Sequence, residues 1–151
     1  MKNVWYYDFP IGRTAIACDD TGITDVTVST VEAREKETEL IQEAAKQLKE
    51  YFCGQRREFD VPLSISGTDF QKSVWNALMR IPYGETRSYK YIAADVGNPK
   101  ASRAVGMANN RNKIIIIIPC HRVIGADGSL VGYGGGLDIK KRLLDIEKGL
   151  L

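Results

Sequence analysis

The sequence predicts an α+β protein with two parts, a small antiparallel sheet with one helix followed by a mainly helical part. Short β-rich runs separated by turns fill the first thirty residues, whereas apolar residues at helical spacing dominate after residue 66. Charge divides at the same point. Residues 1–66 carry eight Lys and Arg against twelve Asp and Glu, and residues 67–151 carry thirteen against seven. We therefore place a domain boundary between residues 66 and 67.

The composition excludes several classes of protein. A chain of 151 residues with 44% hydrophobic and 26% charged residues is typical of a soluble globular protein. It has neither an apolar run long enough to span a membrane nor a signal-peptide core near its start, so we expect no membrane partner and a cytoplasmic location. Three widely spaced cysteines indicate a reducing compartment. With one histidine and no C-x-x-C pair, we expect no metal and no cofactor.

Three β-rich runs open the chain and predict an antiparallel meander. They read NVWYYDFPIG, RTAIACDDTG and ITDVTVST, with turn residues between them. From about Glu35 to Phe52, apolar residues recur at helical spacing among Glu and Lys, which predicts an amphipathic helix that stops at Gly54. A further strand is predicted within FDVPLSI, residues 59–65.

The second part is predicted to begin with a helix in SGTDFQKSVWNALMRIPYG, ended by Pro82 and Gly84. A short helix from Tyr89 to Val96 follows, then a Gly-Asn-Pro turn and a second helix from about Lys100 to Asn109. Two short helices joined by such a turn match the helix-turn-helix pattern, although an ordinary pair of antiparallel helices gives the same signal.

Basic residues are concentrated in the same region. Between Arg80 and Arg122 the chain has eight basic residues and only two acidic ones. This excess predicts either a polyanionic partner or a solvated basic surface, and charge alone does not separate the two.

The stretch IIIIIPCHRVIG, residues 114–125, carries the chemistry. It predicts a buried strand that ends at Pro119 and holds Cys120 in place beside His121 and Arg122. Those neighbours supply a base and a positive charge, whereas a cysteine in an apolar run is by default structural and inert. Successive strand residues point to opposite faces, so contact between Cys120 and His121 requires irregular backbone or a bridging water.

Four motifs that follow one another along the chain carry a resemblance to a known family. IPCHRVIG, GYGGGLDIKKRLLDIE, FQKSVWNALMRIPYGETRSY and GNPKASRAVGMANNRN together resemble the O6-alkylguanine-DNA alkyltransferases, also called methylated-DNA–protein-cysteine methyltransferases. The match covers residues 69–147, and residues 1–66 resemble the family in length and layout only. The resemblance implies a ribonuclease H-like N-terminal domain over 1–66. It also implies a winged-helix or helix-turn-helix domain over 67–151 that binds DNA and carries the active site.

The resemblance implies a transfer reaction that occurs once per molecule. Cys120 matches the cysteine that takes the alkyl group from guanine O6 and keeps it, and a thiolate is the soft nucleophile that such a displacement needs. His121 matches the base that deprotonates it through a water, and Glu147 matches the carboxylate that orients the histidine. Judged without the resemblance, Glu147 is one more acid on an amphipathic helix.

The DNA-handling residues are implied in the same way. The target base must leave the duplex to be reached. Arg103 matches the arginine that fills the vacated space, and Tyr89 matches the tyrosine that helps rotate the nucleotide; Lys100 adds a basic side chain to the same helix pair. Asn112 matches an asparagine that braces the turn before the active-site strand. The pocket wall around the guanine corresponds to Tyr133, Gly134, Gly135 and Val123.

Double-stranded DNA containing O6-alkylguanine is the expected partner, with O4-alkylthymine as a second candidate lesion. We expect a monomer without an obligate protein partner. Lys113 and Ile115 stand where relatives usually have prolines, which leaves the pocket's tolerance of large alkyl groups open. Two rival functions remain: a module that only binds alkylated DNA and flags it, with Cys120 inert, and a hydrolase that turns over.

Overall fold

The computed structural model describes residues 1–131, 133 and 136–150. Its chain divides into two compact units, residues 1–65 and 66–151. The first is a sheet with one helix and the second is mainly helical, so the predicted α+β class is confirmed. No helix among the described residues is long and apolar enough to cross a membrane.

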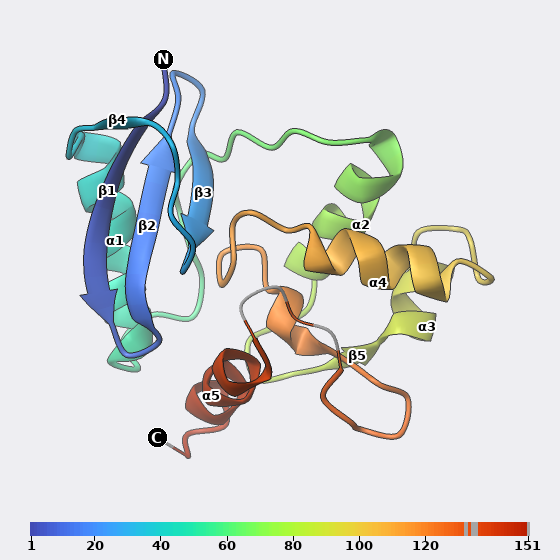
Figure 1. Ribbon diagram of the computed structural model, residues 1–151. Coiled ribbons are helices and arrows are strands. Elements are labelled where there is room, and N and C mark those ends of the chain that lie inside the picture. The colour runs from blue at the N-terminus through green and yellow to red at the C-terminus, as the bar shows by residue number, and fades with distance from the viewer. Residues whose placement is uncertain (132, 134–135, 151) are drawn as a thin grey trace. The chain divides into compact units, whose positions relative to one another are not determined.

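The sheet of the first unit contains the predicted meander. Strands β1 (Asn3–Phe9), β2 (Gly12–Cys18) and β3 (Ile23–Thr27) pair antiparallel in sequence order. A short strand, β4 (Arg34–Glu35), pairs parallel with the start of β1 and gives the order β3-β2-β1-β4. In Figure 1 this sheet lies in front of the single helix of the unit.

That helix begins later than predicted. Helix α1 runs over Glu39–Phe52, not from Glu35, because the chain at Arg34–Glu35 is extended along β1. Thr38 then caps the helix, and its hydroxyl accepts a hydrogen bond from the backbone N–H of Ile41. The strand predicted in residues 59–65 is also wrong: only Leu63 forms a bridge, to Ile23, so this segment follows the sheet without joining it as a strand.

The second unit starts with the predicted helix. Helix α2 (Asp69–Met79) begins at a capping box, in which Thr68 and Gln71 satisfy each other's backbone N–H groups. Helices α3 (Tyr89–Asp95) and α4 (Ser102–Asn110) follow as the predicted helix pair. The Trp75 indole on α2 donates to the carbonyl of Ala108 at 2.8 Å, which ties α2 to the last turn of α4.

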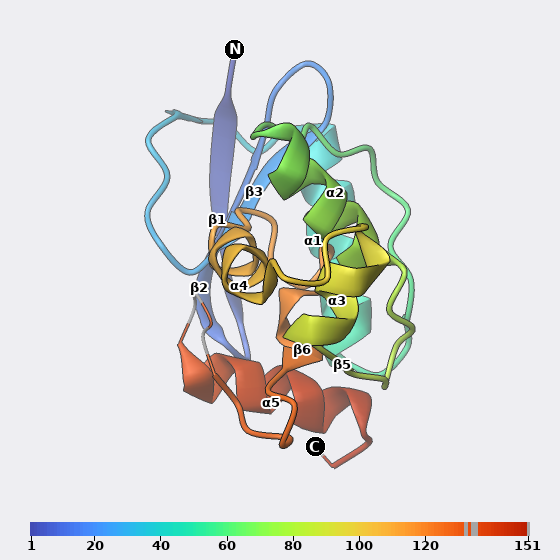
Figure 2. The ribbon, with the colours of Figure 1, turned by 90° about the vertical axis from the view of Figure 1, so that its right-hand side faces the viewer.

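The remaining elements of the second unit are short, except for the last helix. Strands β5 (Arg87–Ser88) and β6 (Val123–Ile124) pair parallel. A single 3₁₀ turn, η1 (Cys120–Arg122), leads into β6, and helix α5 (Leu137–Glu147) follows the glycine-rich segment. Figure 2 shows α3 beside α4, and β5 beside β6.

The five isoleucines are buried, but they do not form the predicted strand. They make a tight turn in which the backbone N–H of Ile118 donates to the carbonyl of Ile114 at 3.0 Å. Ile116, at the apex, has φ +74°, a left-handed conformation that is costly for a β-branched residue. Burial and β-propensity are the same in a strand and in this turn, which is why the apolar run predicts a strand. Within the part of the chain that the structure describes, no strand pairs with the run.

Candidate active site

Cys120 is the first residue of the 3₁₀ turn and is buried, with a solvent exposure of 2%. A 3₁₀ turn rotates successive side chains by about 120°, whereas a strand rotates them by about 180°. The side chains of Cys120 and His121 therefore do not point in opposite directions, as they would in a strand. The 3₁₀ turn is the irregular backbone that contact between them requires. This turn exists because Pro119 precedes it and the N–H of Arg122 donates to the Pro119 carbonyl at 3.0 Å.

A buried charge cluster joins the two residues that follow the cysteine to the last residue of α5. The Nε2 atom of His121 is 2.5 Å from Glu147 Oε2, and the guanidinium of Arg122 donates to both oxygens of the same carboxylate at 2.8 and 3.1 Å. The backbone N–H of Gly84 donates to Glu147 Oε1 at 3.2 Å. Glu147 is therefore a buried hub that orients the His121 ring, not an exposed acid.

These contacts determine the protonation states. Burial alone would raise the pKa of Glu147, but His121 and Arg122 outweigh burial and hold this pKa well below its usual range. Burial lowers the pKa of His121, so the imidazole is neutral near pH 7. An ionised Glu147 then accepts a hydrogen bond from Nε2–H of the neutral ring. Among the described residues His121 Nδ1 has no hydrogen-bond partner, so its lone pair is the basic position of the site.

The cysteine itself is held as a thiol in the resting protein. Burial raises its pKa to about 11, although hydrogen bonds from Asn112 and Tyr133 and the charge of Lys140 pull in the opposite direction. A base must therefore remove the proton when the reaction occurs. The surrounding groups are arranged to favour the thiolate once it forms.

Asn112 braces the isoleucine turn, as the resemblance implies. Its side chain accepts from the N–H of Ile114 at 2.9 Å and donates to the carbonyl of Ile118 at 2.8 Å. Asn109, a buried residue of α4 that sequence reasoning did not single out, donates to the Cys120 carbonyl at 3.3 Å. Two asparagines thus hold the backbone on either side of Pro119.

The residues proposed to handle DNA lie on or beside α4 and α3. Arg103 is exposed on α4, whose buried side consists of Val105, Ala108 and Asn109. Lys100 is exposed in the turn before α4, not within the helix as predicted, because α4 begins at Ser102.

The pocket residues are placed only in part. Tyr89 begins α3, and its hydroxyl donates to the carbonyl of Val131 at 2.6 Å. Val123 is buried at the start of β6, directly after the 3₁₀ turn, and Tyr133 is buried as well. Gly134 and Gly135 lie outside the described residues.

Comparison with known proteins gives the family of this chain. Residues 4–65 match the family model of the 6-O-methylguanine DNA methyltransferase ribonuclease-like domain, and residues 69–149 match that of the DNA binding domain. The chain belongs to the 6-O-methylguanine DNA methyltransferase family. It is similar to the methylated-DNA–protein-cysteine methyltransferase of Methanosarcina acetivorans, with 53% identity over 148 residues, covering 93% of this chain and 95% of the relative.

Solved structures give the same family. The crystal structure of the Mycobacterium tuberculosis O6-methylguanine methyltransferase matches with a TM-score of 0.91 and 46% identity, covering 100% of this chain and 95% of that one. A structure of Mycobacterium tuberculosis OGT in complex with DNA matches with a TM-score of 0.88 and 46% identity, covering 98% and 94%. Both matches extend over the two units of the chain.

Two members of this 6-O-methylguanine DNA methyltransferase site were missed or misread from sequence. Arg122 was expected to favour the thiolate, but its charge is engaged by Glu147. Lys140 was not singled out, although its spacing places it with Leu143, Leu144 and Glu147 on the buried face of α5. A lysine at an apolar position of an amphipathic helix is the signal that was available. Among the described residues, no three His, Cys, Asp or Glu side chains gather as a metal site requires.

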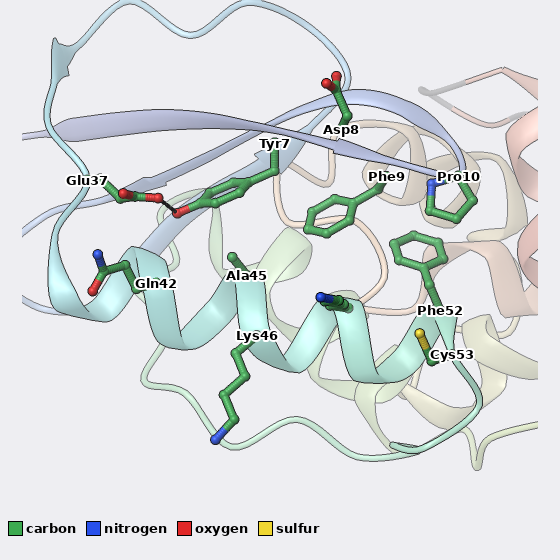
Figure 3. Close-up of a pocket in the computed structure, with 11 residues that line it drawn as sticks. Tyr7, Asp8, Phe9, Pro10, Glu37, Gln42, Ala45, Lys46, Phe52 and Cys53 are labelled. Atoms are coloured by element: carbon green, nitrogen blue, oxygen red, sulfur yellow. Dashed lines mark hydrogen bonds between the residues drawn. The ribbon is translucent and has the colours of Figure 1, made fainter.

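A separate groove of about 630 Å³ lies within the first unit of this family member. Figure 3 shows Tyr7 and Phe9 of β1 above α1, with Phe52 at the end of the helix. The Tyr7 and Phe9 rings stack, as do those of Phe9 and Phe52, and the Tyr7 hydroxyl donates to Glu37. None of the residues proposed for alkyl transfer lines this groove.

Replacing Asn112 by alanine is expected to destabilise the protein by about 1–3 kcal/mol, because a buried N–H and a carbonyl lose their partners at once. Release of the strained Ile116 turn should also slow reaction at Cys120. Urea unfolding measures the first effect and single-turnover transfer the second. Asn110→Ala, at an exposed position of α4, is the matched control and should change neither.

Proposed function

We propose that this protein repairs DNA directly by moving an alkyl group from guanine O6 to Cys120, one group per molecule. The observation that carries the proposal is a buried cysteine at a 3₁₀ turn, next to a neutral histidine oriented by an ionised, Arg-bound Glu147. This arrangement supplies a base for the thiol.

The reaction proceeds by displacement at carbon. His121 Nδ1 accepts the Cys120 proton through an intervening water, and the thiolate attacks the alkyl carbon in line with the departing oxygen. The sulfur–carbon bond forms as the carbon–oxygen bond breaks. The guanine keeps the electron pair of the broken bond and takes up one proton. Because a thioether is not hydrolysed, Cys120 is not regenerated.

The target nucleotide must leave the helical stack before this reaction. In the proposal Arg103, exposed on α4, enters the stack in its place, and Tyr89 assists rotation of the nucleotide. Lys100 contacts phosphate from the preceding turn. Membership in the family and the match to a relative in complex with DNA support DNA as the partner. We further propose action as a monomer and a cytoplasmic location.

The test is stoichiometry. Protein is mixed with excess duplex DNA containing a single O6-methylguanine, and intact and peptide masses are recorded. One added methyl group, confined to Cys120, is expected; Cys120→Ala should accept none, and Cys53→Ala, which removes an exposed cysteine, should react normally. Tight DNA binding with an unmodified Cys120 would contradict the proposal and indicate a protein that only binds alkylated DNA and flags it. Repeated turnover of substrate would instead indicate a hydrolase.

The pH dependence should report His121, which is the one histidine of the chain. Transfer should slow as the pH falls below the pKa of this histidine, which burial places under its usual value of about 6.5. Stability should fall in the window just above this, as the pH drops from about 6.5 to the pKa of the folded histidine, because there the unfolded chain binds a proton and the folded chain does not. Urea unfolding at pH 7.5 and 5.5 measures the loss. In a His121→Gln variant the loss of stability between pH 7.5 and 5.5 should become smaller. An unchanged loss in that variant would mean that another group causes the pH dependence.

A further inference from the structure

The sheet of the first unit has an open edge beside β1. The short strand β4 pairs with β1 only at Asn3 and Val4, and the chain turns into α1 soon afterwards. The rest of β1, residues 5–9, pairs with β2 on one side. On its other side no segment of the described residues pairs with it. An unpaired edge of this kind offers main-chain hydrogen bonds to a further strand.

Two residues of β1 present these free backbone groups. The Val4 carbonyl points toward the side of β4, where it accepts a hydrogen bond from the N–H of Lys36 at 3.1 Å. The direction of the backbone N–H and C=O groups alternates from residue to residue along a strand, so those of Tyr6 and Asp8 point to the same side. In the part of the chain that the structure describes, neither residue has a backbone partner there.

The groove of about 630 Å³ lies along this edge, between β1 and α1. Tyr7 and Phe9 line it from β1, and Figure 3 shows both rings above α1. The lining residues of the helix follow one another at spacings of three and four and so share one face. They are Gln42, Ala45, Lys46, Lys49, Phe52 and, at the C-cap, Cys53. A strand paired with the open edge would therefore direct every second side chain toward this face of α1.

The charges at the groove indicate what such a strand carries. The helix face has two exposed lysines, Lys46 and Lys49, and no acidic residue, although residues 1–66 have eight Lys and Arg against twelve Asp and Glu. Two acids line the groove elsewhere. Glu37 accepts a hydrogen bond from the Tyr7 hydroxyl, and in Figure 3 Asp8 points away from α1. The groove therefore suits an apolar or aromatic side chain with an acidic one beside it.

We propose that the open edge of β1 and this groove bind an extended peptide segment of another protein, which adds a strand to the sheet. Main-chain hydrogen bonds to Tyr6 and Asp8 hold the segment. One of its apolar or aromatic side chains packs on the Phe9 and Phe52 rings. An acidic side chain two residues along lies on the same face of the added strand and pairs with a lysine of α1. The proposal does not depend on alkyl transfer.

The first experiment uses linear ten-residue peptides displayed on phage as the probe and the full chain as the target. Selected peptides should alternate apolar and polar residues and contain Asp or Glu, and they are synthesised to measure dissociation constants. Methylation of the backbone nitrogen at every second residue tests strand pairing, because only every second N–H faces β1. One alternation should abolish binding and the other should leave it nearly unchanged. The amide hydrogens of Tyr6 and Asp8 should exchange more slowly in the complex.

The second experiment tests the charges of the groove. Reversing both lysines, Lys46→Glu with Lys49→Glu, should weaken binding of the selected peptides about ten-fold. Both side chains are exposed, so the fold should be retained. The control is Lys72→Glu, which makes the same kind of change at an exposed position of α2 and should leave the affinity unchanged. Failure to enrich any peptide, equal effects of the two methylation patterns, or binding insensitive to the double reversal would overturn the proposal. None of these measurements involves DNA, so they are independent of the outcome for repair.

Discussion

Replacing Glu147 by glutamine is expected to slow methyl transfer by about 10²- to 10⁴-fold, the usual contribution of a positioned acid–base group. The amide cannot hold His121 Nε2–H as an ionised carboxylate does, and it leaves the Arg122 guanidinium buried without its counter-ion. Loss of one partner of a buried ion pair costs about 3–5 kcal/mol of stability. The rate is measured in single-turnover reactions with duplex O6-methylguanine, and stability by urea unfolding.

The matched control is Asp145→Asn, which removes an acid from the same helix that pairs with the exposed Lys141. Its effect on stability should stay within about 1 kcal/mol, since exposed ion pairs contribute little. A transfer rate in Glu147→Gln close to that of the control would contradict the role of the carboxylate. A loss of stability with the rate retained would show that the cluster serves the fold alone.

Replacing Arg103 by alanine is expected to separate DNA handling from chemistry. Extrusion of a nucleotide costs a few kcal/mol, and without a side chain to fill the gap the flipped state becomes rarer, so transfer from duplex DNA should slow by about 10²- to 10³-fold. Transfer from free O6-methylguanine needs no flipping and should be unchanged. Both rates are measured by the appearance of methylated Cys120.

Arg111→Ala is the control for charge, because it removes a second exposed arginine at the end of the same helix. This variant should weaken DNA binding in a salt-dependent manner without a comparable loss in the rate at saturating DNA. If Arg103→Ala loses activity equally with DNA and with the free base, the arginine acts on the active site and not on the base stack.

Local patterns determined a large part of this protein. The meander, the amphipathic helix and the helix pair follow from turn residues and from period-2 and period-3.6 spacing, which act over a few residues. Cys120, His121 and Glu147 could likewise be predicted as site residues from the sequence, because these residue types at these positions match one family. The helix predicted from Glu35 is wrong at its start because a neighbour far along the chain, β1, holds Arg34–Glu35 extended.

Only the tertiary structure decided how the chemistry is assembled. Five isoleucines specify burial but not their partners, and without a strand beside them they close into a turn around Ile116 that Asn112 braces. The ionisation of the site depends on contacts between residues more than twenty positions apart, which pair both His121 and Arg122 with Glu147. Charge states follow from burial and from the charges within a few ångströms, and these quantities exist only once the chain has folded.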